Sequence, residues 1–529
     1  NELRTSRYQA KFLAGVAREL TFQMEPGPSP AIRFPETGPY DERLGYTHLP
    51  ALIEKQAEKG YEIEAQARFS PEMLKLTNQG IFPTYHEKTQ AGLRILDGDE
   101  RVIFEARYPE RVYKTFDSIP DLIVRTLLFI ENRELLDPRY PYRNPAVEWD
   151  RLAMAALQMV RHVVDKDQNV SGGSTLATQM EKFRHSPEGR TSSPIDKLKQ
   201  MASASLRAYL DGEETLNARY QVILDYINSV PLAALPDYGE VRGLGDGLWA
   251  WYESDFDAVN RLLTNNSDQN LQARALAYRQ ALSLLLAQRR PFLYLIQNRE
   301  ALNSLTNSYL SLLAEGGVIS LEMRDAALQA RPRFRRGAPA LPDVSFLERK
   351  ADNAIRTHLL SLLNVPRLYD LDRFDLTVKS TLDVRTQKEI TQVLRQVGAP
   401  AYADSASLRG EHLLGRGNTA GVIYSFTLYE RGQNVNLLRV QTDNFDQPFN
   451  INEGVKLELG STAKLRTLVN YLEIVANVHG RCAHLPRAHD LGLGRRLGPE
   501  GGGDGRWAGG RAHLLGALHA PLSLRPHGR

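Results

Sequence analysis

A carboxylate at the end of an apolar segment is the first residue whose type and position would allow chemistry. Glu131 follows Leu127-Leu128-Phe129-Ile130. A carboxyl group at such a place is partly desolvated, which makes it a better base near neutrality. Alone this is weak evidence, because most glutamates at helix ends are solvated surface residues.

A second candidate is the run Gly172-Gly173-Ser174-Thr175, with Gln179 and Lys182 behind it. Paired glycines let the backbone approach a ligand closely, and Ser or Thr at a helix start offers donors to an anion. Lys197 adds positive charge on a predicted helix. Each of these patterns is usually a plain loop or a solvated face. Together, a carboxylate base and lysines for a phosphate-bearing leaving group suggest glycosyl transfer from a pyrophosphate donor.

A third candidate is Ser461-Thr462-Ala463-Lys464, a Ser-x-x-Lys pattern behind Phe449-Asn450. The i, i+3 spacing puts Ser461 and Lys464 on one helical face, where a neutral lysine would take the serine proton and create an acylating nucleophile. Such machinery also needs Ser-x-Asn and Lys-Thr-Gly further on, and neither occurs after Lys464. We therefore expect a truncated, inactive module, with a plain helix N-terminus as the alternative.

Helices must position the first two candidates, and the middle of the chain is predicted to be nearly all α. Ser118 suits an N-cap and Pro120 a first turn for the helix that ends near Glu131. Further helical periods cover 148–163, 194–210, 215–228, 272–288 and 297–314. Strand patterns lie on either side: a hairpin over 94–104 with an Asp-Gly turn, a strand over 376–382, and a second hairpin around Arg431-Gly432-Gln433. A helix is predicted to run from Ser461 through Val475.

The order of these motifs resembles the peptidoglycan glycosyltransferases of family 51, the catalytic module of class A penicillin-binding proteins, over about 119–328. The family's pattern is Glu-Asp-Arg, Gly-Gly-Ser-Thr-Ile-Thr-Gln-Gln, Arg-Lys-x-x-Glu and Ile-Leu-Glu-x-Tyr-Leu-Asn. The matching segments here are Glu131-Asn132-Arg133, 172–179, 196–200 and Ile223-Leu224-Asp225-Tyr226-Ile227-Asn228. The resemblance implies a lysozyme-like α fold and polymerisation of lipid-linked disaccharide-peptide (lipid II) into glycan strands, with release of undecaprenyl pyrophosphate.

The resemblance also implies roles for single residues. Glu131 matches the catalytic base, which deprotonates the acceptor hydroxyl as it attacks the donor's anomeric carbon. Substrate-binding positions of the second, third and fourth motifs fall on Ser174, Thr175, Gln179, Lys182, Lys197 and Asn228, with Asn228 structural as much as catalytic. Ser461 and Lys464 match the nucleophile and base of the penicillin-binding transpeptidases.

Some positions depart from the family pattern. Asn132 replaces an Asp, Thr178 a Gln, Phe183 an Asn, Asp196 an Arg, and Gln200 the second Glu. A glutamine cannot act as a charged ligand or base. The role of the family's second glutamate is then dispensable, or another group such as Asp196 takes it over, or catalysis is impaired. No cofactor is required by the sequence. A divalent cation such as Mg²⁺ would bind at the pyrophosphate, but the loss of that carboxylate weakens the argument for it.

Composition is that of ordinary globular protein, with 529 residues, 42% apolar and 24% charged. A net charge of +3 is too small to argue for a nucleic-acid partner. The single cysteine, Cys482, excludes a disulfide within the chain and a Cys-based metal site. No run of 18 apolar residues predicts a transmembrane helix, and a membrane anchor or signal could precede Asn1.

From His479 onward the chain changes character. The segment holds six of the 12 histidines and 12 of the 39 glycines, and it has no lysine. A flexible tail, a basic His-rich interaction segment and translation out of frame from a GC-rich gene would each give this composition. The third is favoured, because the break falls just inside a recognisable domain.

The predicted fold class is multi-domain α+β. A mostly α, lysozyme-like glycosyltransferase domain precedes a mixed α/β linker and the start of a transpeptidase domain. The expected ranges are 1–95 (accessory, membrane-proximal), 96–330 (glycosyltransferase), 331–375 (linker), 376–478 (start of the transpeptidase domain) and 479–529 (aberrant tail). The expected partners are the lipid-linked precursor, the inner membrane at its periplasmic face and cell-wall synthesis proteins. A lysozyme-like enzyme that cleaves glycan and a non-catalytic scaffold remain alternatives.

Overall fold

The computed structural model describes residues 2–148, 174–265, 270–337, 346–410, 414, 419–433, 435–447, 451–454 and 460–482. The chain divides into two compact units, Asn1–Gly454 and Val455–Arg529. Helices dominate the described residues and the sheets are small, as the predicted α+β class requires. Gly172, Gly173, nearly all of the helix predicted over 148–163 and most of the tail lie outside the described residues.

The first 95 residues form short helices and one two-stranded sheet. Strands β1 (Phe22–Pro26) and β2 (Ala65–Phe69) pair antiparallel. The helices here are α1 (Glu2–Thr5), α2 (Arg7–Glu19), α3 (Pro39–Arg43), α4 (Leu49–Glu58) and α5 (Pro71–Asn78). Ala10 and Ala14 of α2 pack against Ala208 and Tyr209, so this part of the chain shares a core with the helical region that follows.

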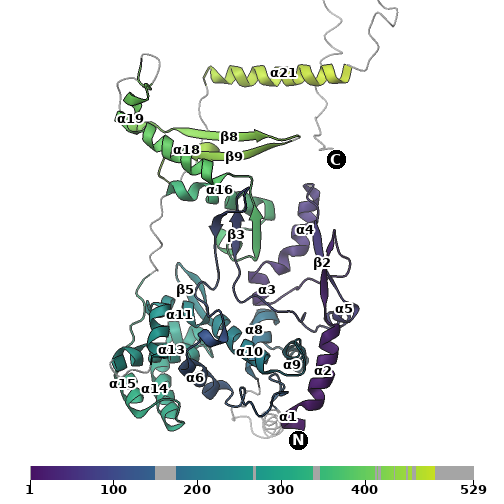
Figure 1. The fold of residues 1–529 in the computed structure, drawn as a ribbon, viewed down its shortest axis with the longest axis vertical. Coiled ribbons are helices and arrows are strands. Elements are labelled where there is room, and N and C mark those ends of the chain that lie inside the picture. The colour runs from purple at the N-terminus through teal and green to yellow at the C-terminus, as the bar shows by residue number, and fades with distance from the viewer. Residues whose placement is uncertain are drawn as a thin grey trace, which may run out of the picture. The chain divides into compact units, whose positions relative to one another are not determined.

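The helical region packs around one long helix, α13 (Leu271–Ala287), which lies among other helices (Figure 1). From Ala275 onward nearly all of its side chains are buried, the polar Arg279, Gln280 and Ser283 included. The surrounding helices are α6 (Asp121–Glu131), α8 (Leu176–His185), α9 (Pro194–Ala208), α10 (Leu216–Ser229), α11 (Gly243–Tyr252), α12 (Phe256–Thr264), α14 (Arg299–Glu315) and α15 (Leu321–Gln329), with a hairpin of β5 (Pro231–Leu235) and β6 (Gly239–Arg242). The helices predicted over 194–210, 215–228, 272–288 and 297–314 are confirmed as α9, α10, α13 and α14.

A three-stranded sheet joins segments far apart in the sequence. Strands β3 (Leu93–Leu96) and β4 (Val102–Glu105) form the predicted hairpin, and β3 also pairs in parallel with β7 (Leu376–Lys379). Leu93 and Ile95 of β3 pack against side chains of α16 (Phe346–Leu363) and of the segment around α17 (Leu368–Leu371). Helix α16 lies within 331–375, the range expected to form a mixed α/β linker.

The remaining elements of the first unit follow β7. They are α18 (Val384–Val397), α19 (Pro400–Ser405), β8 (Ser425–Arg431), β9 (Asn436–Asp443) and α20 (Ile451–Gly454). Strands β8 and β9 pair antiparallel, which confirms the second predicted hairpin. The described part of the second unit is one helix, α21 (Thr462–Cys482). Within the described residues, none of the helices combines the length and the apolar character needed to cross a membrane.

Three predicted boundaries are wrong. Ser118 does not cap α6, because it ends a short 3₁₀ turn closed by a capping box with Thr115, and Pro120 stands at the N-cap position. The strand predicted over 376–382 ends at Lys379. Helix α21 continues beyond Val475 to Cys482.

Candidate active site

Glu131 is the last residue of α6, and its carboxylate is surrounded by N–H donors. Gln179 Nε2 donates to Glu131 Oε2 at 3.2 Å, and Gln288 Nε2 donates to Oε1 at 3.3 Å. Arg289 Nη2 lies 3.5 Å from the same Oε1. The Glu131 side chain keeps 13% of its surface exposed, so the carboxylate is held in place but can still be reached.

Tyr226 on α10 holds Gln179 in this arrangement. Its hydroxyl donates to Gln179 Oε1 at 3.5 Å, and its ring is fully buried. Burial raises the pKa of the Tyr226 hydroxyl well above its ordinary value, and the nearby Glu131 charge raises it further. The phenol therefore remains a neutral donor, which fixes the Gln179 amide with its N–H side toward Glu131.

Two lysines lie on neighbouring helices, and Lys182 interacts electrostatically with both Glu131 and Lys197. Lys182 on α8 and Lys197 on α9 are half-buried. Burial lowers the pKa of Lys182, repulsion by Lys197 lowers it further, and Glu131 acts in the opposite direction. No ion-pair partner for either lysine is found among the described residues. Two lysines whose charges repel each other offer positive charge to a polyanion.

The start of α8 is fixed by a capping box. Thr175 Oγ1 accepts from the Thr178 amide, and Thr178 Oγ1 accepts from the Thr175 amide at 2.9 Å. Both side chains are buried, and Ser174 precedes them half-buried. The Thr175 hydroxyl thus serves the helix start, and its predicted contact with substrate stays a prediction. The threonine that replaces the family's Gln at position 178 completes this cap.

Asn228 on α10 makes structural hydrogen bonds. Its Nδ2 donates to the Tyr113 carbonyl at 2.8 Å, and its Oδ1 accepts from the Tyr113 amide at 2.9 Å. The side chain is 2% exposed. Both ends of the amide are therefore used by one backbone residue, and the contacts of Asn228 lend no support to its prediction as a substrate-binding residue.

The departures from the family pattern also have local explanations. Asn132 Oδ1 accepts from the Glu134 amide at 3.2 Å just past the end of α6, a bond that an amide oxygen accepts as well as a carboxylate. Gln200 is buried between Ser186 and Thr191, donating to Ser186 Oγ at 2.7 Å. Asp196 accepts from Ser192 Oγ at 2.7 Å in the first turn of α9. No hydrogen bond or ion pair in the described residues joins Gln200 or Asp196 to Glu131.

A divalent cation at the pyrophosphate stays a prediction. No three His, Cys, Asp or Glu side chains in the described ranges are grouped to hold a metal ion. Mg²⁺ needs at least one or two carboxylates besides substrate phosphates, and Glu131 already accepts from two amides with an arginine beside it. No step below depends on a metal.

Ser461 and Lys464 lie in the second unit, at the start of α21. The Lys464 amide donates to the Ser461 carbonyl at 3.1 Å, and both residues are exposed. Among the described residues, no hydrogen bond joins Ser461 Oγ to Lys464 Nζ. Their predicted roles as nucleophile and base stay predictions.

Sequence reasoning missed three residues that build the site. Gln288 and Arg289 follow the end of α13, and Tyr226 lies within a segment recognised only for its resemblance. The polar pair Gln288-Arg289 directly after the apolar end of a long helix was a usable signal. Its approach to Glu131 was not visible in the sequence, because 157 residues separate Glu131 from Gln288.

Comparison with protein-family models gives a match. A search of curated proteins finds no match for this chain. Residues 99–313 match the family model described as Transglycosylase, and this range contains α6, α8, α9, α10 and α13 with Glu131 and both lysines. Residues 99–313 are therefore a transglycosylase domain of glycosyltransferase family 51.

Proposed function

We propose that this chain polymerises lipid-linked disaccharide-peptide (lipid II) into glycan strands, with Glu131 as the general base. The observation that carries the proposal is the pairing of one accessible carboxylate with two half-buried lysines that have no ion-pair partner in the described residues. A base and an electropositive site side by side are what transfer from a pyrophosphate donor needs.

In this mechanism Glu131 accepts the proton of the acceptor sugar hydroxyl while that oxygen attacks the anomeric carbon of the donor. The bond between this carbon and the pyrophosphate oxygen breaks, and the electron pair leaves with undecaprenyl pyrophosphate. Lys182 and Lys197 would lie on the side of the leaving group and stabilise its developing charge. Gln179, Gln288 and Arg289 hold the carboxylate in a fixed orientation, so that the base is preorganised.

The reaction would take place at the periplasmic face of the cytoplasmic membrane, because a lipid-linked donor is delivered there. Cell-wall synthesis proteins would be partners at that surface. Ser461 and Lys464 would belong to an incomplete transpeptidase module, and we expect no acylation of Ser461 by a fluorescent β-lactam. Covalent labelling of wild-type protein that Ser461→Ala abolishes would contradict this expectation.

The test of the polymerase function uses the full chain and lipid-linked disaccharide-peptide in detergent, with glycan polymer separated by size. Glu131→Gln should lower the polymerisation rate about 100-fold or more, the usual contribution of general base catalysis. Glu134→Gln is the matched control, because this neighbouring glutamate is exposed and pairs with Arg143. An unchanged rate in Glu131→Gln would remove Glu131 as the base.

The same assay separates the two alternatives. A lysozyme-like enzyme would shorten preformed glycan and leave lipid-linked substrate unconsumed. A scaffold would bind the lipid-linked substrate without making polymer, and Glu131→Gln would then change nothing in the assay.

A further inference from the structure

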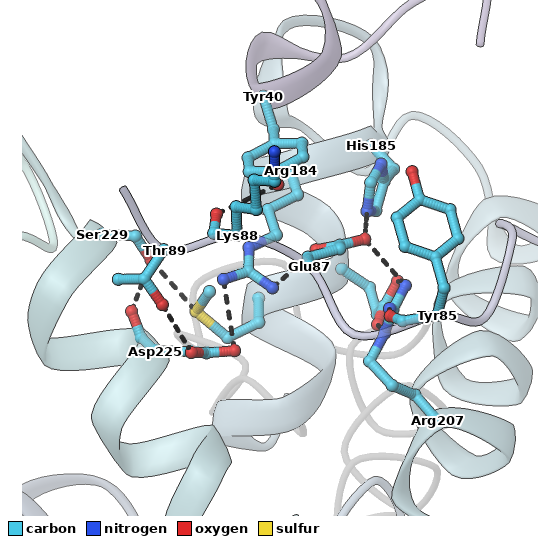
Figure 2. Close-up of polar contacts among 12 residues, drawn as sticks. Tyr40, Tyr85, Glu87, Lys88, Thr89, Arg184, His185, Arg207, Asp225 and Ser229 are labelled. Carbon is cyan, nitrogen blue, oxygen red and sulfur yellow. Dashed lines mark hydrogen bonds and ion pairs between the residues drawn. The ribbon is translucent and has the colours of Figure 1, made fainter. Parts of the chain in front are cut away.

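A buried ionic network connects the N-terminal region with the helices that carry the candidate site (Figure 2). We call it the Glu87 network. Its members are Asp41, Glu87, Glu181, Arg184, His185, Arg207 and Asp225. Asp41 and Glu87 precede the segment that matches the transglycosylase family, residues 99–313.

Glu87 is the centre of the network, and its side chain is fully buried. Its carboxylate lies 2.6 Å from Arg184 Nη1 and 2.5 Å from His185 Nε2, both at the end of α8. The same carboxylate lies 2.9 Å from Arg207 Nη2 on α9. One side chain from outside the matched segment thus contacts two of the helices of the site.

The arginines extend the network to a third helix. Arg184 Nη2 lies 3.3 Å from Asp225 Oδ2 on α10, next to Tyr226. Arg207 Nε lies 2.7 Å from Glu181 Oε1, which ties α9 back to α8. Helices α8, α9 and α10 are therefore linked through Glu87 and its partners.

His185 is held on both ring nitrogens. Its Nδ1 lies 2.7 Å from Asp41 Oδ2, while its Nε2 faces Glu87. Burial alone would lower the pKa of His185, but attraction to Glu87 and the hydrogen bonds to Asp41 and Glu87 outweigh it and raise the pKa to about 10. His185 is thus an imidazolium at neutral pH, with both N–H groups donated to carboxylates.

The backbone also approaches the end of α8 closely at Gly38. Its φ of +119° is a conformation that other residues rarely adopt, and a Cβ built there would lie 2.6 Å from the Arg184 carbonyl oxygen. The chain before α3 therefore lies directly against the residues that Glu87 binds.

The contacts of Glu87 with α8 and α9 also affect the two lysines of the site. Lys182 lies one helical turn before His185 on α8, and Lys197 lies on α9. Burial lowers the pKa of Lys182 and repulsion by Lys197 lowers it further, and this repulsion favours separation of the two helices. Glu87 opposes this separation, because the same carboxylate binds cations on both helices.

We propose that Glu87 is a positioning residue for glycosyl transfer, which sets the spacing of Lys182 and Lys197 by joining α8 and α9. The functional catalytic unit then includes the segment from Gly38 to Glu87, ahead of the residues that match the family. The proposal rests on the proposed function for its meaning in catalysis, but the spacing of the lysines can be tested without polymerisation.

The first measurement is binding of inorganic pyrophosphate to the full chain by titration calorimetry. Glu87→Gln should weaken this binding about tenfold, and Asp41→Asn, which removes only one contact to His185, should weaken it less. Glu25→Gln is the matched control, because Glu25 also precedes the family match but forms an exposed pair with Arg68. Each variant is measured well below its unfolding temperature, with folding verified by circular dichroism.

The second measurement is a double-mutant cycle with Lys182→Ala. If Glu87 acts through the lysines, Glu87→Gln should weaken pyrophosphate binding much less in the Lys182→Ala background than in the wild-type chain. A general loss of stability would instead give the same fold-change in both backgrounds and would overturn the proposal. If Glu87→Gln fails to fold, Asp41→Asn replaces it in the same cycle, with the same two outcomes.

Polymerisation separates this proposal from the proposed function. Glu87→Gln should lower kcat/KM for the lipid-linked donor about tenfold, because the lysines bind the pyrophosphate and stabilise the charge that develops on it. A wild-type chain that makes no polymer but shows the coupling in the cycle would overturn the polymerase function and leave the positioning role. A wild-type chain that makes polymer and shows additive effects would overturn the positioning role alone.

Discussion

The side-chain amide of Gln179 points its nitrogen at Glu131, 3.2 Å from Oε2, and its oxygen at the Tyr226 hydroxyl, 3.5 Å away. The hydrogen bond between Gln179 and Glu131 connects the middle of α8 to the last residue of α6. Because the buried tyrosine is a donor at neutral pH, the amide cannot turn around without losing both bonds. Helix α8 therefore helps to orient the base as well as carrying Lys182.

Replacing Gln179 by Leu should slow polymerisation roughly 10- to 100-fold. The change removes a hydrogen bond to a charged group, which contributes about 1.5–3 kcal/mol, and leaves the Tyr226 hydroxyl without its acceptor. Initial rates of polymer formation from lipid-linked substrate measure the effect. Gln79→Leu, at an exposed position just past α5, is the control and should keep the wild-type rate. Equal rates for Gln179→Leu and the wild-type chain would contradict the orienting role.

Arg289 offers a second test of how the carboxylate is held. Arg289→Ala removes the cation 3.5 Å from Glu131 Oε1, and we expect a rate about tenfold lower, since hydrogen bonds to charged groups contribute about 1.5–3 kcal/mol and this contact is long and partly exposed. Arg290→Ala, the exposed neighbour, is the control. The loss should shrink as salt rises to about 1 M, because an exposed ion pair is screened. A salt-independent loss would point to a packing role for Arg289.

The elements that carry the site could be predicted from the sequence because their signals are local. The apolar run before Glu131 and the helical periods of α9, α10 and α13 each depend on residues a few positions apart. The cap of α8 at Thr175 was not predicted. Local signals also explain the errors. Ser118 has the composition of a cap, but the capping box with Thr115 draws it into an earlier turn.

The partners of these elements could not be predicted, since contacts between distant segments leave no pattern in one sequence. Gln288 meets Glu131 across 157 residues, and His185 meets Glu87 across 98. Spacing predicts which residues share a helical face, whereas tertiary packing decides which faces meet. The same limit applies to Gln200, whose type signals a lost carboxylate but whose burial against Ser186 only the structure shows.

The raised pKa of His185 predicts how stability depends on pH. The pKa of His185 is about 10 in the folded chain and ordinarily 6.5. Its charge therefore stabilises the folded chain fully below pH 6.5, progressively less above pH 6.5, and not at all once the pH exceeds about 10. Between pH 6.5 and pH 10, the titratable groups in contact with His185 are the carboxylates of Asp41 and Glu87. Burial raises the pKa values of Tyr40 and Tyr85 above that of His185.

The variant His185→Gln isolates this contribution. At pH 6 it should be less stable than the wild-type chain by about 3–5 kcal/mol, the usual cost of removing one partner of a buried ion pair. The difference in thermal midpoint should shrink steadily between pH 7 and pH 10. A constant difference over that range would show that His185 is neutral in the folded chain. His86→Gln, at an exposed histidine near Glu87, is the control.

Restoring the family's glutamate at position 200 should destabilise the chain and not activate it. Gln200 is 3% exposed and donates to Ser186 Oγ at 2.7 Å. A carboxylate there loses the donor and is buried, which costs about 2 kcal/mol or more. We expect Gln200→Glu to lower the thermal midpoint at pH 7 by about 5 °C, while Gln79→Glu leaves it unchanged.

The pH dependence of this variant identifies the cause. Burial raises the pKa of a carboxyl group, so the penalty is present above the ordinary Glu pKa and decreases as the pH falls toward it. At pH 5 the protonated carboxyl group introduced by Gln200→Glu would donate to Ser186 Oγ again, and the deficit should be smaller than at pH 7. Polymerisation should not rise at either pH, since no described contact links position 200 to Glu131. A faster rate with Gln200→Glu would mean that this position reaches the substrate and that the natural glutamine limits catalysis.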